Sequence, residues 1–177
     1  MKLPNDLSPY RVDGLTLRAM TAEDVDGMLR LQDAMLAALP DRRWYYPSER
    51  WEFELGVQNA DTFGYLDGDA LVGFAMITPA QLRKERGYAH KLGEKIEGTY
   101  DFHDVMVVPE YRRRGIHSAF LRLFEDMARA EGGRAIYSTV DPENGASCRN
   151  FERAGYRLLL TQPAYDGRTR RYYLREL

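Results

Sequence analysis

The chain of 177 residues contains a single cysteine, Cys148, and lacks any long run of apolar residues. One cysteine excludes an internal disulfide bond and a cysteine-rich zinc site, and it suits a reducing compartment. No stretch approaches the roughly 18 apolar residues that a membrane-spanning helix needs, so we expect no membrane association. The formal net charge is only −2, which gives no long-range attraction to nucleic acid. Any anion site must therefore come from a local arrangement of residues.

Common nucleotide-binding motifs are also missing. No G-x-x-x-x-G-K-[ST] sequence occurs, and no G-x-G-x-x-G follows an expected strand. These absences argue against a P-loop and against a dinucleotide-binding Rossmann site. The residues suggest no metal site. Because the N-terminus has no apolar segment of signal-peptide length, we expect a cytoplasmic protein.

The composition is that of one globular domain. Apolar residues make up 44% of the chain and charged residues 29%, and the length suffices for one sizeable core. We therefore expect a single domain over residues 1–177, in which residues 1–14 form an N-terminal extension.

Hydrophobic periodicity predicts strands and helices in the order β-α-α-β-β-β-α-β-α-β-β. This order indicates an α/β or α+β fold with helices on the faces of a sheet. A polar insertion over residues 78–98 is a candidate lid. In the strand over residues 100–109, strict alternation would place four residues on one face and Asp104 on the other. Those four residues are Asp101, His103, Val105 and Val107.

Three arginines and a glycine lie at the turn between that strand and a long amphipathic helix. The segment reads VPEYRRRGIHSAFLRLFEDMARA, from Val108 to Ala130. A helix N-terminus has unpaired N–H groups and a partial positive charge, so it can bind an anion such as a phosphate. The alternative is that the arginines form an ordinary solvated turn.

Two segments carry a resemblance to a known family. VVPEYRRRGIHSAFL resembles the acetyl-CoA motif of the GNAT superfamily of N-acetyltransferases, V-x-P-x-x-[RQ]-x-x-G-x-[GA]. Arg112, Gly115 and His117 occupy its last three defined positions. DPENGASCRNFERAGY resembles the second motif of the family, an Asn followed by a short helix that ends in Gly-Phe or Gly-Tyr. The motif-specific core spans residues 101–156.

The resemblance implies a mixed, mostly antiparallel sheet of about six or seven strands in which one parallel pair splays apart. The pantetheine arm of acetyl-CoA would lie in that gap, against backbone groups of Val105 and Val107. The diphosphate would bind at the N–H groups of Arg113 to Ser118. The implied cofactor-binding residues are Val105, Val107, Arg112, Arg113, Arg114, Gly115, Ile116, His117, Ser118, Asn144 and Ser147.

Two positions depart from the family pattern. His117 stands where the family has Gly or Ala, so its imidazole must point away from the cofactor or lie beside a phosphate. Phe151 stands where many members carry the tyrosine thought to protonate the departing thiolate. Tyr156, Tyr172 and Tyr173 are possible substitutes for that acid. Loss of a general acid slows an enzyme without abolishing the rate that positioning supplies.

The attacking amine must lose a proton, which requires a base near the thioester. Asp101 and His103 are the candidate catalytic residues, since they resemble in position the paired histidines of the arylalkylamine branch. Asp101 also matches the glutamate of the histone branch. The alternative is that the two side chains simply pair with each other or with neighbouring polar groups.

The acceptor site of this family is built by the loop and second helix of the N-terminal region and by the last hairpin. Aromatic residues there predict a slot for an amine; the candidates are Trp44, Tyr45, Tyr46 and Tyr165. We expect direct acetyl transfer to a primary amine of a small molecule, and a homodimer is the candidate assembly. The alternatives are acetylation of a protein N-terminus or lysine, and a catalytically idle acetyl-CoA-binding regulatory module.

Overall fold

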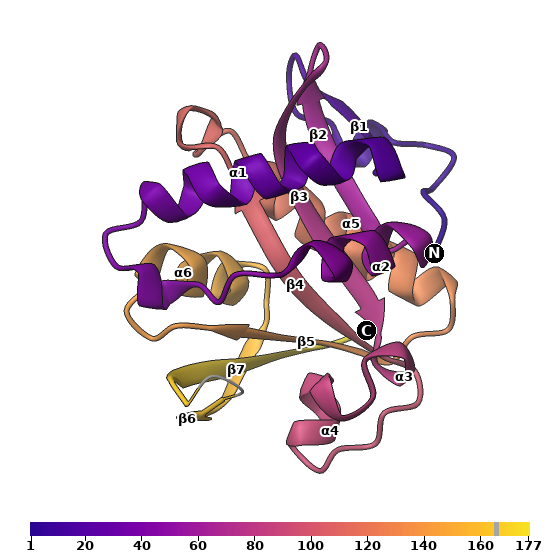
Figure 1. Cartoon of the computed structure of the whole chain (residues 1–177). Helices are drawn as coiled ribbons and strands as arrows, with labels where there is room; N and C mark the ends of the chain where they lie inside the picture. Colours follow the sequence, from indigo (N-terminus) through magenta and orange to yellow (C-terminus); the bar gives the residue numbers. More distant parts are fainter. Residues whose placement is uncertain (165–166) are drawn as a thin grey trace.

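The computed structural model describes residues 1–164 and 167–177 (Figure 1). Its centre is a seven-stranded sheet with the strand order β1-β2-β3-β4-β5-β7-β6. The strands are β1 (Thr16–Ala19), β2 (Thr62–Asp67), β3 (Ala70–Pro79), β4 (Thr99–Val107), β5 (Ala135–Val140), β6 (Arg157–Pro163) and β7 (Thr169–Glu176). The helices are α1 (Val25–Ala37), α2 (Arg50–Gln58), α3 (Ala80–Arg83), α4 (Tyr88–Lys91), α5 (Ile116–Ala130) and α6 (Gly145–Arg153).

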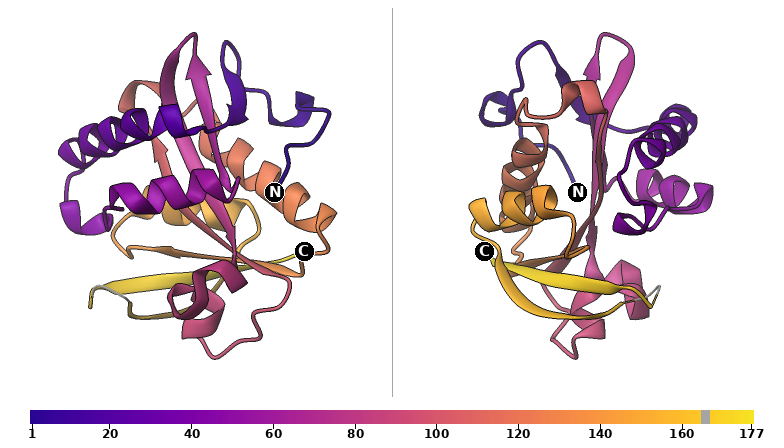
Figure 2. Two further views of the ribbon diagram at one scale, coloured as in Figure 1. Left: turned by 45° about the vertical axis from the view of Figure 1, so that its right-hand side comes forward. Right: turned by 90° about the vertical axis from the view of Figure 1, so that its left-hand side faces the viewer.

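Helices cover both faces of the sheet. Figure 2 shows α1 and α2 on one face and α5 and α6 on the other. All neighbouring strands run antiparallel except β4 and β5, which are parallel. The expected mixed, mostly antiparallel sheet with one parallel pair is therefore confirmed.

The parallel pair separates along its length. β4 and β5 pair only from Thr99 with Ala135 to Asp101 with Tyr137, although β4 continues to Val107 and β5 to Val140. Just beyond the last pair, Ser138 Oγ donates to the backbone oxygen of Phe102 at 2.9 Å. A side chain thus replaces the ladder where the two strands diverge, and a gap opens beyond it.

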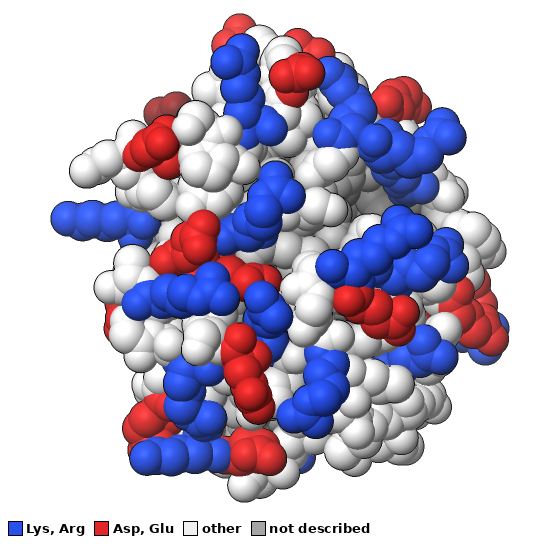
Figure 3. Space-filling model, turned by 180° about the vertical axis from the view of Figure 1, so that it is seen from behind, with Lys and Arg blue, Asp and Glu red and all other residues white. Residues whose placement is uncertain are grey.

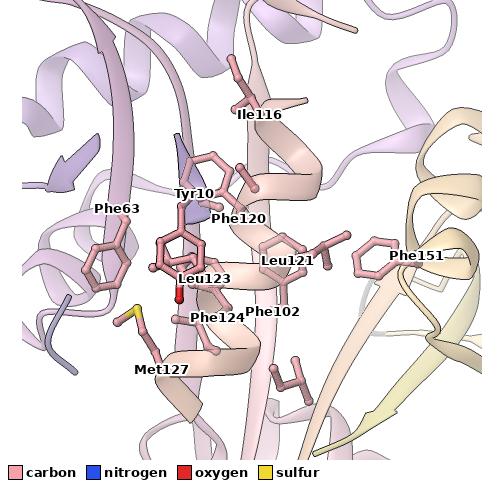
Figure 4. Packing of buried hydrophobic residues seen from close by; sticks show 14 of the residues in the cluster. Tyr10, Phe63, Phe102, Ile116, Phe120, Leu121, Leu123, Phe124, Met127 and Phe151 are labelled. Carbon is pink, nitrogen blue, oxygen red and sulfur yellow. The ribbon is translucent and has the colours of Figure 1, made fainter. Parts of the chain in front are cut away.

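Among the residues that the structure describes, the two larger of three apolar clusters fill the two sides of the sheet, and the third packs α4 against β5 and β7. On the α5 side, Phe120 and Phe124 pack with Phe63 and Phe102, and Phe151 of α6 extends the cluster (Figure 4). On the opposite side, α1 and α2 cover a second cluster with several methionines and two phenylalanines. The two larger clusters therefore pack against opposite faces of the same sheet.

The first residues of the chain belong to the α5-side cluster. Tyr10 and Val12 are buried in it. The Tyr10 hydroxyl donates to Asp126 of α5 at 2.7 Å, and the Tyr65 hydroxyl of β2 donates to the Tyr10 carbonyl at 2.6 Å. The N-terminal extension therefore closes one side of the core.

β4 does not alternate strictly, which corrects the predicted faces of this strand. One extra residue of β4 lies between the pairs Met76–His103 and Phe74–Met106, and Asp104 adopts a φ of 51°. This β-bulge reverses the alternation after it. Asp104 therefore faces the α2 side together with His103, whereas the side chains of Val105 and Val107 pack against the α5-side cluster.

Charged side chains of both signs are intermixed over the rear face of the molecule (Figure 3). This surface agrees with the small net charge of −2. Within the described residues, no helix is long and apolar enough to cross a membrane. Within the same residues, no group of three or more His, Cys, Asp or Glu side chains could hold a metal ion.

Candidate active site

A cleft of about 1580 Å³ runs along the gap between β4 and β5. One end reaches the start of α5 and α6, and the other lies between the loop before α2 and the α3–α4 insertion. Ligand pockets commonly occupy roughly 300–1,000 Å³. The larger volume suits a cleft that holds two molecules end to end.

The start of α5 forms the first end of the cleft. Gly115 precedes the helix with a φ of 89°, and Arg113 is also left-handed, with a φ of 63°. Left-handed residues beside a helix start turn successive backbone N–H groups toward one point, which creates an anion-binding concavity. The first-turn amides of α5 have no partner within the helix. This geometry supports the predicted phosphate site.

The three arginines of the turn do not act alike. Arg112 and Arg113 line the cleft. Arg114 does not, because its guanidinium donates to the Asp13 carbonyl at 2.8 Å and lies 5.1 Å from the ring centre of Tyr111. The structure thus gives Arg114 a link to the N-terminal segment and leaves two arginines for a phosphate group.

His117 turns inward from the first turn of α5. Its ring packs edge-on against Phe151 at 5.3 Å and lies 5.8 Å from the Phe102 ring. Both ring nitrogens are buried without a hydrogen-bond partner in the described residues. Burial lowers the pKa of His117 to about 4, so the imidazole is neutral at physiological pH. His117 also lines the cleft, so its ring contacts Phe102 and Phe151 from a position beside the predicted cofactor site.

The second motif forms the wall beside this turn. Asn144 caps α6, and its side chain accepts from the Ser147 amide at 3.2 Å. Asn144, Ser147 and Phe151 all line the cleft. The three candidate replacements for the missing tyrosine do not line it in the described structure; they are Tyr156, Tyr172 and Tyr173.

The residues present fit acetyl-CoA. The cofactor needs an anion cradle for its diphosphate and a slot with free backbone groups for its pantetheine arm. The α5 turn provides the cradle, and β4 beyond Asp101 provides an edge that β5 leaves unpaired. Val105 and Val107 line the cleft along this edge.

His103 lies in the acceptor half of the cleft. Its Nδ1 lies 2.6 Å from Asp104 Oδ2, and its Nε2 lies 2.9 Å from Thr78 Oγ1. Asp104 Oδ1 accepts from the Tyr45 hydroxyl and from Ser48 Oγ, the latter at 3.0 Å. Burial opposes ionisation of Asp104, but the hydrogen bonds and the nearby positive charge outweigh it and lower its pKa to about 2. An ionised Asp104 therefore orients the His103 ring.

Gln32 of α1 holds the loop that carries these partners. Its side-chain amide donates to the Ser48 carbonyl at 2.9 Å, and its side-chain oxygen accepts from the Ser48 amide at 2.8 Å. Gln32 is itself buried. These two hydrogen bonds fix the loop against α1 and thereby set the positions of Tyr45 and Ser48 over Asp104.

Asp101 occupies a different environment from the one predicted. Its side chain is fully buried and does not line the cleft. Its carboxylate accepts from the Tyr88 amide at 3.0 Å and pairs with Arg83 Nε at 3.0 Å. Burial raises the pKa of Asp101. The carboxylate thus anchors the α3–α4 insertion to β4.

The aromatic residues predicted for the acceptor site largely come together. Trp44, Tyr45 and Tyr46 line the cleft, whereas Tyr165 lies outside the described residues. On the opposite wall, Arg86 of the insertion lies 5.0 Å from the Trp51 ring centre and pairs with Glu52 at 3.0 Å. These two contacts tie the insertion to α2 across the mouth of the cleft.

Sequence reasoning missed three polar residues of the acceptor half. Asp104 was expected on the far face, and Thr78 and Asp61 were not singled out. Asp61 and Thr78 line the cleft with His103. The available signal was weak: an acid and a hydroxyl at strand ends, with no fixed spacing to the histidine.

This arrangement defines a class of enzyme. A parallel strand pair that opens beside a helix-terminal anion cradle, with a polar acceptor half, is the geometry of a CoA-dependent acyltransferase. The model of the acetyltransferase (GNAT) family matches residues 27–156, and the chain belongs to this family. It is an acetyltransferase, and its acyl donor is acetyl-CoA.

Two curated relatives and several solved structures are similar to the chain. The N-alpha-acetyltransferase RimI of Mycobacterium tuberculosis is 27% identical over 159 residues, which cover 90% of this chain and 84% of the relative. An uncharacterised protein of Mycobacterium leprae is 26% identical over 162 residues. The aligned residues cover 90% of this chain but only 40% of the length of that protein. 

Solved structures share the fold at lower identity. The ribosomal-protein-S18-alanine N-acetyltransferase of Escherichia coli has a TM-score of 0.67 at 15% identity, over 92% of this chain and 93% of that one. A GNAT-family acetyltransferase of Streptococcus pneumoniae has a TM-score of 0.70 at 17% identity, over 92% and 99%.

Proposed function

We propose that the protein transfers acetyl from acetyl-CoA to the α-amino group of a protein or peptide. The observation that carries amine acetylation is the His103–Asp104 pair, which lies in the same cleft as the α5 cradle. The peptide acceptor is supported by the similarity to a relative named as an N-alpha-acetyltransferase. It departs from the small-molecule acceptor that the sequence favoured.

The surface of the acceptor half also supports a chain-like substrate. Four large apolar side chains line this part of the cleft and are more than a third exposed; they are Tyr46, Trp51, Leu55 and Leu82. Exposed apolar residues that border a cleft favour binding of a partner segment. A peptide extended between α2 and the insertion would cover them, whereas a small amine would leave most of them in water.

The proposed chemistry requires a neutral amine beside the thioester. Bound acetyl-CoA supplies an activated acetyl carbonyl. An α-amino group has a pKa of about 7.7–8.0, whereas a lysine amine has one of about 10.4. A modest base therefore suffices for an α-amine, and His103, oriented by ionised Asp104, provides it.

Direct attack is proposed because the single cysteine of the chain is not placed to carry the acetyl group. Cys148 is 2% exposed and does not line the cleft in the described structure. Phe151 occupies the position of the family's tyrosine acid, so we propose that the departing thiolate takes its proton from water. Positioning and carbonyl polarisation then supply most of the rate.

An acceptor panel tests the proposal. It contains peptides with a free α-amine, the same peptides blocked at the N-terminus but carrying lysine, and arylalkyl amines. We expect acetylation at the α-amine, located by mass spectrometry. His103→Gln should lower kcat/KM by about 10²–10⁴-fold with unchanged acetyl-CoA affinity, and His90→Gln, at an exposed helix position, should match the wild type.

A small-molecule amine is the second candidate acceptor. The three aromatic residues Trp44, Tyr45 and Tyr46 in the cleft favour it, because stacked rings select compact apolar amines. Acetylation of the small amines alone would replace the peptide proposal with this one. Acetyl-CoA binding without turnover on any member of the panel would instead indicate a regulatory module.

A further inference from the structure

The acceptor half of the cleft contains a continuous chain of hydrogen-bonding groups that extends past the candidate base. Thr78 of β3 lies between Asp61, which precedes β2, and His103 of β4. The Thr78 hydroxyl oxygen is 2.6 Å from Asp61 Oδ2 and 2.9 Å from His103 Nε2. All three side chains line the cleft.

The number of hydrogens in this chain is informative. A threonine hydroxyl carries one hydrogen, yet Thr78 is within hydrogen-bonding distance of two groups that accept when deprotonated. Both contacts are satisfied only after the chain has taken up one additional proton; before uptake, one of the two contacts lacks a hydrogen. That proton belongs either to His103 Nε2, which then donates to Thr78, or to Asp61, which then donates to Thr78.

The two arrangements differ by a shift of two hydrogens. In the first, imidazolium Nε2–H donates to Thr78, and the Thr78 O–H donates to the Asp61 carboxylate. In the second, the Asp61 acid O–H donates to Thr78, and the Thr78 O–H donates to neutral imidazole. The proton count and the total charge are the same in both, and His103 Nδ1–H donates to Asp104 throughout.

We propose that Asp61, Thr78 and His103 act as one base unit, in which the Thr78 hydroxyl relays the proton of the acceptor amine and His103 and Asp61 share it. This inference rests on the proposed acetyltransferase function. Thr78 is the catalytic residue that meets the amine, His103 is the base that receives the relayed proton, and Asp61 is a positioning residue that acts through Thr78. The ammonium N–H bond breaks, its proton passes to the Thr78 oxygen while the Thr78 hydrogen passes to His103 Nε2, and the electron pair stays on the nitrogen as the nucleophile.

The environment of Asp61 supports this role. Asp61 is 1% exposed, and its carboxylate accepts hydrogen bonds from two hydroxyls, Thr62 at 3.2 Å and Thr78 at 2.6 Å. Burial, the largest effect, raises the pKa of Asp61 above the ordinary carboxyl value. Burial makes this carboxylate bind a proton more readily than a solvated one, and the two hydroxyl hydrogen bonds offset only part of that effect.

The surrounding charges distinguish the two carboxylates next to the unit. The charged groups that face it are Asp104 and Asp101 of β4 and Arg83 of α3, and Glu52 of α2 lines the same cleft. Asp104 has a pKa lowered to about 2, because its bonds to His103 and Tyr45 outweigh burial. Asp104 contacts the imidazole directly and has a lowered pKa, whereas Asp61 reaches it through Thr78 and has a raised pKa. Asp61 is therefore the carboxylate that shares the proton.

Ring-proton NMR of the protein without cofactor or substrate tests the proposal. The titration midpoint of His103 is compared among the wild type, Thr78→Val, Asp61→Asn and Thr78→Ser. Valine removes the hydroxyl at nearly constant volume, and asparagine removes the negative charge, so both should lower the midpoint by about one unit. Thr78→Ser keeps the hydroxyl and should retain the wild-type midpoint.

The pH profile of kcat/KM supplies a second readout on the best acceptor. Thr78→Val should reduce kcat/KM about 10-fold or more near neutral pH. It should also shift the lower limb of the profile to lower pH, with acetyl-CoA affinity unchanged. Circular dichroism confirms that each variant is folded. A His103 midpoint that is the same in all four folded proteins would overturn the shared-proton proposal. The NMR titration needs no turnover. A protein that acetylates nothing would therefore refute the proposed function, whereas the titration would still show whether Asp61, Thr78 and His103 share a proton.

Discussion

His117 shows how one residue changes both the cofactor site and the stability of the fold. It stands at a position where the family motif has a small side chain. The ring fills space between Phe102 and Phe151, and its nitrogens are buried without hydrogen-bond partners. A buried imidazole of this kind costs stability whenever it must be charged.

We expect His117 to make the protein less stable in mild acid. The His117 imidazole binds a proton near pH 6.5 in the unfolded chain and near pH 4 in the folded chain. The stability that comes from keeping His117 neutral is therefore fully present above pH 6.5 and is lost as the pH falls toward 4. His117→Phe should therefore gain about 1–2 kcal/mol relative to the wild type at pH 5 and little at pH 7.5. Urea unfolding at both pH values measures this difference in the free energy of unfolding, with His90→Gln as the control. A difference of the same size at both pH values would contradict a role of His117 protonation.

The arginines of the α5 turn lead to a second prediction at residue scale. Arg113 lines the cleft, whereas Arg114 is bound to the Asp13 carbonyl. An exposed charge contact contributes about 1 kcal/mol, so Arg113→Gln should weaken acetyl-CoA binding about 5-fold. Arg114→Gln should weaken it about 2-fold or less. Isothermal titration calorimetry at low salt compares the two, and the reverse order would show that the phosphates bind on the other side of the turn.

At the scale of elements, the acceptor half depends on how closely α2 approaches β2 and β3. Gly56 of α2 is the point of contact. A Cβ built there would lie 2.1 Å from Met76 Cε, 2.7 Å from Thr62 Oγ1 and 2.9 Å from Asp61 Oδ1. Only a residue without a side chain allows the helix to lie this close to the Asp61 carboxylate.

Gly56→Ala should therefore destabilise the protein, even though alanine favours helices. Overpacking costs about 1–3 kcal/mol, which exceeds the gain in helix propensity of about 0.5–1 kcal/mol. Gly27→Ala in α1 is the matched control, since its nearest contacts are at 3.9 Å, and it should be neutral or stabilising. Denaturant unfolding of both variants decides the point, and a Gly56→Ala protein as stable as Gly27→Ala would contradict the close packing.

The same element scale explains why β4 carries the chemistry. Its inserted residue, Asp104, has a φ of 51° and turns a carboxylate toward the histidine that precedes it. In a regular strand these neighbours would face opposite sides of the sheet. The bulge thus places an acid and an imidazole on one face, next to the gap that opens between β4 and β5.

At the scale of the whole molecule, the α5-side cluster depends on the N-terminal segment as well as on the sheet. Tyr10 is 4% exposed and joins this segment to both α5 and β2 through its hydroxyl and its carbonyl. We therefore expect residues 1–14 to unfold together with the rest of the fold, although they precede the first strand.

Shortening Tyr10 should lower the stability of the entire domain in one transition. Tyr10→Ala creates a cavity in the core and should cost about 3–5 kcal/mol, or roughly 2–4 °C in Tm per kcal/mol at this size. Tyr10→Phe loses one hydrogen bond and should cost about 0.5–1.5 kcal/mol. Circular dichroism and tryptophan fluorescence should give coincident midpoints; separate midpoints would mean that the N-terminal segment unfolds on its own.

The elements and the cofactor half could be predicted because their signals are local. Hydrophobic periods locate the strands and helices, and the arginine–glycine turn with the Asn144 helix carries the family motifs. Helix-terminal N–H groups are a property of any helix, so a motif at a strand–helix turn indicates an anion site without knowledge of the rest of the fold. These features depend on neighbours in the chain.

The acceptor half was decided by the tertiary structure. A period-two pattern cannot show where an extra residue enters β4, so Asp104 was expected on the wrong face. Nor could Asp101 be recognised as the anchor of the insertion, because its partner Arg83 lies on another element. The chain of Asp61, Thr78 and His103 joins three separate strand regions at distances of 2.6 and 2.9 Å. Hydrogen bonds are specific to within a few tenths of an ångström, and only the packed sheet sets distances that finely.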